Sequence, residues 1–295
     1  MRESELLAHI YERSTGLPPV ISVGPGDDAA EIVVEGGRAL VTVDQLVEGR
    51  HYDPATTDVD LVARKAVGRS VSDIAAMGGR PTCAFATAAL REGFADADRL
   101  FDRMAAWAKG WGCPLAGGDI ATVDGPTVLT VTVMGTPHAG RGSVLRSGAR
   151  VGDSVYVTGK VGGAFASGRH LMFEPRVREG SWLCDALGER LRAMIDVSDG
   201  VGRDAGRVAK MSGARIEIDA GALPLHEDAG DWREAVGAGE DYELLFCASG
   251  EVAERCAETG TVITKIGRVV EGEGCFVVAP DGARVDAREL GWDHG

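Results

Sequence analysis

Acidic residues recur in five short segments, each at the end of a predicted strand or in the turn beside it. The segments are 26–28 (GDD), 41–44 (VTVD), 117–119 (GGD), 195–199 (IDVSD) and 239–241 (GED). A sixth acidic position, Asp73, lies in a predicted helix. Any one of them alone is most simply a turn or helix-cap residue. Together they favour a shared site, because loops at one edge of a sheet are where binding sites are commonly built.

Carboxylates without accompanying His or Cys ligands point to a hard cation, Mg²⁺ above all. Proteins bind Mg²⁺ through a few carboxylates, water and substrate phosphates. Glycine beside the carboxylates lets a phosphate approach backbone N–H groups, so the pattern predicts metal-bridged ATP. The chain has no GxxxxGK[ST] motif, and its segment 24–29 (GPGDDA) has acids where a GxGxxG loop needs glycine. ATP would therefore bind by another scheme.

Composition narrows the class of protein. The 295 residues carry a net charge of −14, which argues against nucleic acid or an anionic membrane as the main partner. Bound Mg²⁺ can reverse the sign of an acidic pocket, so a nucleotide is not excluded. The six cysteines include no CxxC pair, and the charged N-terminus does not resemble a signal peptide. These features predict a cytoplasmic protein with reduced thiols and no membrane span.

The first half of the chain alternates predicted strands and helices. A helix is expected over 3–13, a hairpin of strands over 29–35 and 38–44, and a helix from Asp58 to the glycines at 78–79. Because Asp28 precedes one hairpin strand and Asp44 ends the other, their carboxylates should converge. Strands over 81–90, 113–120 and 125–135, with a helix over 94–112, complete a mixed α/β layer.

A Gly-, Ser- and Arg-rich connector suggests two domains, 1–140 and 141–295. The second half again mixes strands and helices. Helices are expected over 161–172, 181–191, 201–213 and 251–260. Strands are expected over 154–159, 193–200, 214–220, 242–249, 264–270 and 275–280.

Eight motifs follow one another along the chain from Gly26 to His294. They are GDDAA, VTVDQLVEGRHY, RKAVGRSVSDIAAMGG, LAGGD, LRSGARVGDSVYVTG, AMIDVSDG, GAGEDYELLF and GWDH. Their order and spacing resemble the thiamine-monophosphate kinase family, part of a larger group of ATP-binding enzymes related to aminoimidazole ribonucleotide synthetase. Each motif alone is modest, but eight in sequence are specific.

The resemblance implies a two-domain α/β (α+β) PurM-like fold. Its N-terminal mixed sheet would pair across a homodimer, and a C-terminal α/β domain would follow. The implied reaction is Mg²⁺-dependent transfer of the γ-phosphoryl group of ATP directly to thiamine monophosphate, which gives thiamine diphosphate and ADP.

The resemblance also implies roles for individual residues. Metal ligands would be Asp28, Thr42, Val43 through its carbonyl, Asp44, Asp73, Asp119, Asp196 and Asp199. ATP contacts would be Gly118, Asp119, Arg146 and Ser198, and substrate contacts would be His51, Glu240 and Trp292. The residues acting most directly on the transferred group would be Asp44, Asp119 and Arg146.

Several of these side chains could instead have a purely structural role. Arg146 could brace ATP oxygens with its planar fork, or be a surface arginine. His51 could contact substrate or be a structural loop histidine. Trp292 could stack on a cationic ring, worth about 0.5–2 kcal/mol, or pack against the tail. Lys65 is a second candidate for the phosphates, although a solvated helix lysine is expected. Asp27 and Asp241 are expected to cap or orient rather than to bind metal.

Two alternatives remain for the chain as a whole. It could be another ATP-dependent enzyme of the same superfamily, or a non-catalytic nucleotide-binding homologue. Selenophosphate synthetase would need a reactive Cys near the glycine-rich start, but the first cysteine is Cys83. A hydrogenase-maturation carbamoyl dehydratase would end in Cys, but this chain ends in Gly295. The retained acids argue against an idle binding protein, because a metal cage without metal is self-repelling.

Overall fold

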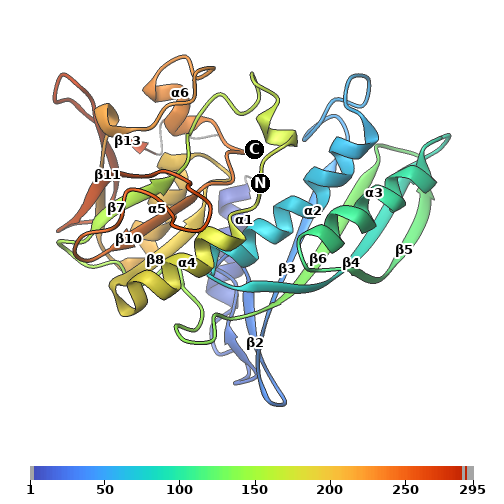
Figure 1. The fold of residues 1–295 in the computed structure, drawn as a ribbon, viewed down its shortest axis with the longest axis horizontal. Coiled ribbons are helices and arrows are strands. Elements are labelled where there is room, and N and C mark those ends of the chain that lie inside the picture. The colour runs from blue at the N-terminus through green and yellow to red at the C-terminus, as the bar shows by residue number, and fades with distance from the viewer. Residues whose placement is uncertain (1–2, 288–289, 291–295) are drawn as a thin grey trace.

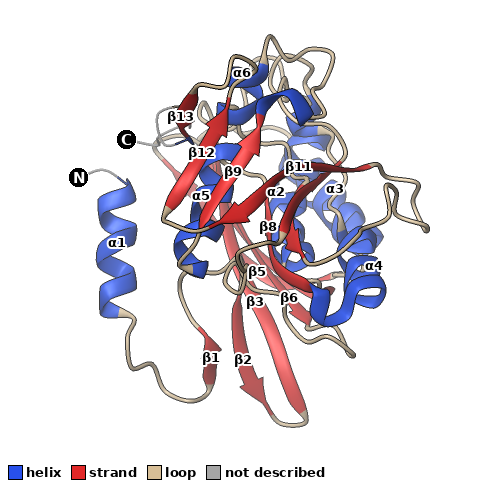
Figure 2. Cartoon of the chain, turned by 90° about the vertical axis from the view of Figure 1, so that its left-hand side faces the viewer, coloured by secondary structure: helices blue, strands red, loops and turns tan. Residues whose placement is uncertain are grey.

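The computed structural model describes residues 3–287 and residue 290, which form two β-sheets with helices packed against them (Figure 1). Helix α1 (Glu3–Arg13) stands beside this body and is joined to it by the segment leading to strand β1 (Figure 2). The mixed α/β class expected from the sequence is confirmed. No helix within the described ranges is long and apolar enough for a membrane span.

The first sheet contains six strands in the order β1-β2-β3-β6-β4-β5. Their bounds are β1 Ile21–Val23, β2 Ala30–Val34, β3 Gly37–Val47, β4 Arg80–Arg91, β5 Leu115–Val123 and β6 Val128–Thr136. β4 and β5 run parallel, and the other neighbours are antiparallel. β6 alternates buried and half-buried residues, the pattern of a sheet with one face in a core.

Helix α2 (Val59–Ala76) is the element that connects the two halves. It begins at Asp58, whose carboxylate accepts the backbone N–H of Asp60, and it ends before Gly78, which adopts a φ of 67°. One side of α2 packs on β3 and β6, and α3 (Ala97–Gly110) lies beside it (Figure 1). It also contacts α4 (Val177–Leu187) and β8 (Leu191–Asp196) of the second half. Side chains of α2 therefore face both sheets.

The second sheet has seven strands in the order β13-β12-β9-β11-β7-β10-β8. Their bounds are β7 Ser154–Thr158, β8 Leu191–Asp196, β9 Arg215–Asp219, β10 Leu244–Ala248, β11 Ile263–Val270, β12 Gly274–Val278 and β13 Arg284–Asp286. Helices α4 (Val177–Leu187), α5 (Val201–Ser212) and α6 (Trp232–Gly237) belong to this half, with short 3₁₀ turns at Arg169–Leu171, Gly188–Arg190 and Ala220–Ala222. β10 is buried throughout, as expected for a strand inside a covered sheet.

Two helices expected from the sequence are wrong. Over 161–172 only a 3₁₀ turn forms, because Gly162, Gly163 and Gly168 adopt φ values of 80°, 68° and 70° that interrupt a right-handed helix. Over 251–260 the backbone pairs with the chain that enters β11, through a hydrogen bond from Ile263 N–H to the carbonyl of Glu254. Tertiary pairing thus overrides the local helical pattern.

Candidate functional site

Three carboxylates from distant parts of the chain meet where the two sheets approach each other. Asp28 precedes β2, Asp73 lies near the end of α2, and Asp196 ends β8. One oxygen from each lies within 4.8 Å of the others. Asp28 and Asp196 are only 8% and 2% exposed. Convergence of buried acids from three elements is the arrangement that a hard cation requires.

The carboxylates of this cluster are poorly solvated and repel one another. Burial raises the pKa of Asp73 well above its ordinary value, and Asp44, Asp196 and Asp28 raise it further. Burial and Asp28 likewise raise the pKa of Asp196. The hydroxyl of Thr42 donates to Asp73, and that of Ser72 donates to Asp196 at 2.6 Å.

The oxygens of the cluster are only partly satisfied by these donors. The buried Oδ2 atom of Asp28 has no hydrogen-bond partner within the described structure. A buried acceptor without a donor is costly, and a bound cation would remove that cost. The three carboxylates therefore fit a divalent metal such as Mg²⁺.

Arg146 closes one side of the cluster. Its guanidinium donates to Oδ1 of Asp28 at 2.7 Å and to the carbonyl of Gly26 at 3.1 Å, and its backbone N–H donates to Asp27 at 2.6 Å. Burial acts to lower the pKa of Arg146, but Asp28 and Asp196 hold that pKa above its ordinary value, so the cation persists. Its buried Nε has no partner among the described residues, which leaves a donor for an anion.

Strand register separates the remaining predicted ligands of the first sheet. Asp44 shares a row, and hence a face, with Val131, Ala86 and Gly118. Val131 is buried beneath α2, so the row that contains Asp44 lies on the side of the sheet that faces α2 and its Asp73. The neighbouring row places the side chain of Asp119 on the opposite face, and Val43 also points that way. In one protomer, therefore, Gly118 joins Asp44, whereas the Asp119 carboxylate does not.

The turn that leads into α5 holds the remaining predicted nucleotide contacts. Arg207 pairs with Asp199 and with Asp204, and the backbone N–H groups of Ser198 and Asp199 donate to Asp204 at 3.1 and 3.0 Å. Burial raises the pKa of Asp204 to about 7, against the opposing effect of Arg207. Asp204 fixes this turn although the sequence analysis did not single it out. Its one signal is an acid in the first turn of a helix, a common capping position.

A second group of polar side chains surrounds Lys65, on a side of α2 that is buried from solvent. The expectation of a solvated helix lysine is wrong, because Lys65 is 0% exposed. Its Nζ forms an ion pair with Glu240 and contacts the carbonyl of His51 at 2.8 Å and Nδ1 of His170 at 2.9 Å. Burial lowers the pKa of His170 to about 4, which keeps its Nδ1 an acceptor for Lys65.

Lys65 therefore brings together two of the three predicted substrate contacts, His51 and Glu240. The third, Trp292, lies outside the described residues. Beside this group is a cavity of about 390 Å³, lined by the 49–57 segment together with Phe165, His170 and Leu171. Phe165 is 55% exposed and packs against the ring of His170 at 4.5 Å. An exposed aromatic face of this kind is suited to a flat cationic ring.

We expect Lys65→Met to lower the free energy of unfolding by about 3–5 kcal/mol, because it leaves the Glu240 carboxylate without its cation. Chemical denaturation would measure the change. The exposed Lys109 of α3 provides a control, and Lys109→Met should cost no more than about 0.5 kcal/mol. A second substitution, Glu240→Gln, should recover part of the loss. If Lys65→Met unfolded at the wild-type denaturant concentration, the ion pair would not be structural.

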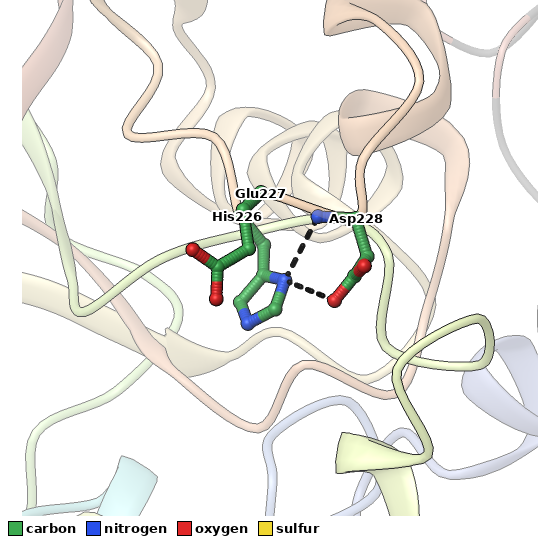
Figure 3. Close-up of side chains that lie close together, drawn as sticks. All are labelled: His226, Glu227 and Asp228. Carbon is green, nitrogen blue, oxygen red and sulfur yellow. Dashed lines mark hydrogen bonds and ion pairs between the residues drawn. The ribbon is translucent and has the colours of Figure 1, made fainter.

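A second group of potential metal ligands lies on a surface turn. It consists of His226, Glu227 and Asp228, consecutive residues of which the two acids are exposed. Figure 3 shows that Nδ1 of His226 already faces Asp228, whose backbone N–H donates to it at 3.2 Å. No buried, unpaired oxygen of the kind found at Asp28 accompanies this turn within the described residues. Of the two groups, Asp28, Asp73 and Asp196 therefore fit a metal ion better.

An apolar groove of about 530 Å³ opens beside Gly118. It is lined by Ala88, Leu100, Phe101 and Met104 as well as by the 117–120 segment. Phe101 is 58% exposed there and was not among the site residues expected from the sequence. A groove of this size and composition can hold a planar heterocycle.

Comparisons with known proteins agree with this geometry. The family model for AIR synthase related protein, N-terminal domain, matches residues 26–136. Thiamine-monophosphate kinase of Rhodopirellula baltica is 34% identical, with 93% of this chain and 91% of that protein covered. The Bacillus subtilis enzyme of the same name is 32% identical, with coverage of 100% and 99%.

A solved structure is similar over the whole chain. AaThiL complexed with AMPPCP and TMP superposes with a TM-score of 0.83 at 29% identity, covering 100% of this chain and 97% of that one. Full-length similarity above 30% identity to curated kinases, together with this shared fold, confirms the resemblance found in the motifs. The chain belongs to the thiamine-monophosphate kinase family.

Proposed function

We propose that this protein transfers the γ-phosphoryl group of ATP to thiamine monophosphate, forming thiamine diphosphate and ADP. The observation that carries the proposal is the convergence of Asp28, Asp73 and Asp196 beside Arg146. Family membership supports the reaction, and a relative of the same fold binds AMPPCP and TMP.

The chemistry explains why so many acids are useful at one site. An oxygen of the acceptor phosphate forms a bond to the γ-phosphorus while the bond from that phosphorus to the β,γ-bridging oxygen breaks, and ADP leaves. Bound Mg²⁺ would offset the repulsion between the two phosphate groups. The acceptor oxygen is already anionic, so no side chain has to remove a proton. The carboxylates of Asp28, Asp73 and Asp196 would hold the metal, and Arg146 would direct its Nε–H at an ATP oxygen.

The two cavities supply places for the rest of both substrates. The adenine of ATP would occupy the groove beside Phe101, with its phosphates passing Gly118, where no side chain blocks the backbone. The thiamine rings would occupy the cavity beside Phe165, which His51 and His170 line, with the Lys65–Glu240 ion pair next to His170. The contacts of Trp292, Ser198 and Asp199 with ligands remain predictions.

We also propose a homodimer built on the first sheet. The face of this sheet opposite α2 is exposed at Val43 (61%) and Phe85 (40%). Apolar side chains on an open sheet face favour a second copy as the covering partner. This face carries Asp119, so a dimer would bury the carboxylate that one protomer leaves outside the cluster. Light scattering should give twice the chain mass, whereas a monomer at micromolar concentration would contradict the proposal.

Product analysis tests the reaction itself. Purified protein with ATP, Mg²⁺ and thiamine monophosphate should form thiamine diphosphate and ADP in equal amounts, as measured by chromatography. Omitting thiamine monophosphate should reduce ADP formation to a small background. ADP formation that does not depend on thiamine monophosphate would instead indicate another ATP-dependent reaction, and binding without turnover would indicate a non-catalytic homologue.

A further inference from the structure

Two buried hydrogen-bond donors next to the acidic cluster have no acceptor. They are the Nε atom of Arg69 and the hydroxyl of Tyr242, and neither finds a partner within the described structure. Tyr242 is only 2% exposed, so bulk water does not supply a hydrogen-bond partner for its hydroxyl. Leaving buried donors unsatisfied is costly, and native proteins rarely do so without a functional reason.

The two donors lie near the same charged side chains. Burial raises the pKa of Tyr242 well above its ordinary value; Arg69 opposes this effect, and Glu240 and Asp44 add to it. Arg69 is itself held in place, with Nη1 donating to the carbonyl of Gln45 at 2.9 Å and Nη2 3.6 Å from Asp44. Because a guanidinium and a protonated phenol both donate, the missing partner is an acceptor, and the cation favours an anionic one.

The backbone that carries Tyr242 is strained in a way that fixes its hydroxyl. Glu240 and Tyr242 are the described non-glycine residues with positive φ, at 68° and 52°. The ring of Tyr242 stacks on Phe173 with centroids 3.9 Å apart. Strained φ values on bulky residues persist where the surroundings hold them, and they concentrate at functional sites.

Spacing along α2 places Arg69 between the two halves of the reaction. Lys65, Arg69 and Asp73 are four residues apart and therefore lie on one helix face, about 6 Å apart along the axis. Lys65 contacts His170, which lines the cavity proposed for the thiamine rings, and Asp73 belongs to the cluster of three carboxylates. A phosphate attached to thiamine must reach from that cavity to the three carboxylates, and this path brings it past Arg69.

We propose that Arg69 and Tyr242 form a clamp for the phosphate of the acceptor substrate. The inference rests on the proposed function and extends it by assigning two residues to the phosphate that is attacked. Arg69 and Tyr242 donate to non-bridging oxygens of that phosphate and leave another oxygen turned toward the metal cluster. The pair acts by orientation, so its loss weakens acceptor binding and attack while ATP binding is retained.

Tyr242→Phe is the sharpest test because it removes one oxygen atom that has no partner in the free protein. We expect kcat/KM for thiamine monophosphate to fall at least about tenfold, the scale of one hydrogen bond to a charged group, with KM for ATP unchanged. The melting temperature should stay equal to wild type or rise. The control is Tyr156→Phe, which removes a buried hydroxyl in β7 whose acceptor is the carbonyl of Gly250 at 3.5 Å; its kcat/KM should equal wild type.

Three outcomes for Tyr242→Phe would overturn the clamp. An unchanged kcat/KM for thiamine monophosphate would show that the hydroxyl does not meet the acceptor. A selective rise in KM for ATP would assign the hydroxyl to the donor phosphates. A lowered melting temperature with proportional loss of active protein would reduce Tyr242 to a packing residue.

Arg69 variants and a binding measurement separate this inference from the proposed function. Arg69→Lys should recover part of the activity lost in Arg69→Met, because it restores charge without the planar fork. Calorimetry with inorganic phosphate and Mg²⁺ should show weaker binding to Tyr242→Phe than to wild type. If wild type makes no thiamine diphosphate but this difference persists, the function fails and the clamp stands. If wild type is active and all variants match it, the clamp fails alone.

Discussion

Replacing Asp73 with Asn should lower kcat at least about 100-fold and, at the same time, raise the melting temperature of the metal-free protein. The loss of activity follows from removing one of the three carboxylates proposed to hold the cation that would stabilise charge on the transferred phosphoryl group. The gain in stability follows from removing a buried charge that Asp28, Asp44 and Asp196 all repel. The amide of Asn can still accept the hydroxyl of Thr42, so the local hydrogen bond survives.

Steady-state kinetics and thermal unfolding of the same preparations would measure both effects. Asp102→Asn, at an exposed position of α3, serves as a charge-matched control and should change neither quantity. Adding Mg²⁺ should stabilise wild type more than Asp73→Asn, because only wild type keeps all three carboxylates. Near-normal kcat in Asp73→Asn would remove Asp73 from the metal site.

Arg146→Met should lower the free energy of unfolding by about 3–5 kcal/mol and abolish most of the activity. The substitution leaves the Asp28 side chain, which is 0% exposed, without its ion-pair partner. It also removes the buried Nε donor, which has no partner within the described residues. The double variant Arg146→Met, Asp28→Asn should regain most of the stability, because the unpaired buried charge is gone, but none of the activity.

Denaturant unfolding of the two single variants and the double variant forms a thermodynamic cycle for this pair. A coupling free energy near zero would mean that Arg146 and Asp28 do not interact in solution. Recovery of activity in the double variant would mean that neither residue contacts the reacting groups, which would contradict the proposed role of Arg146.

Local sequence signals predicted most of the fold. Gly36 and Gly37 placed the β2–β3 hairpin, and Asp58 and Gly78 bounded α2, because turn and cap chemistry is local. The helix expected over 161–172 failed because Gly162, Gly163 and Gly168 adopt positive φ values, and the helix expected over 251–260 failed because that segment pairs with the start of β11. Helix α6 and strand β13 were missed because each is too short for a clear periodic pattern. The boundary between 140 and 141 and the cytoplasmic location stay predictions.

The site was predictable to the extent that it depends on residue type at a strand end. Asp28 and Asp196 follow that rule and lie in the three-carboxylate cluster, whereas Asp44 lies inside β3, which continues to Val47. Lys65 and Tyr242 do not follow it. Lys65 is buried because α2 is covered by both halves of the chain, which periodicity cannot reveal, and Tyr242 is distinguished only by a hydroxyl that lacks an acceptor.

Asp119 shows a different limit of sequence reasoning. Its motif resembles the family pattern, yet the register turns its side chain to the face opposite Asp44. A one-residue step along a strand reverses the face, so a motif alone cannot specify it. Whether its carboxylate completes the site in the assembled dimer stays a prediction.

The most direct test of the central claim is the position of a divalent cation in crystals grown with Mn²⁺ and AMPPCP. Mn²⁺ substitutes for Mg²⁺ at oxygen ligands and is located by its anomalous scattering. The account predicts a peak at bonding distance, about 2 Å, from oxygens of Asp28, Asp73 and Asp196, shared with the phosphates of the nucleotide. Mn²⁺ found only elsewhere, for example at the His226–Asp228 turn, with nothing between the three carboxylates, would contradict it.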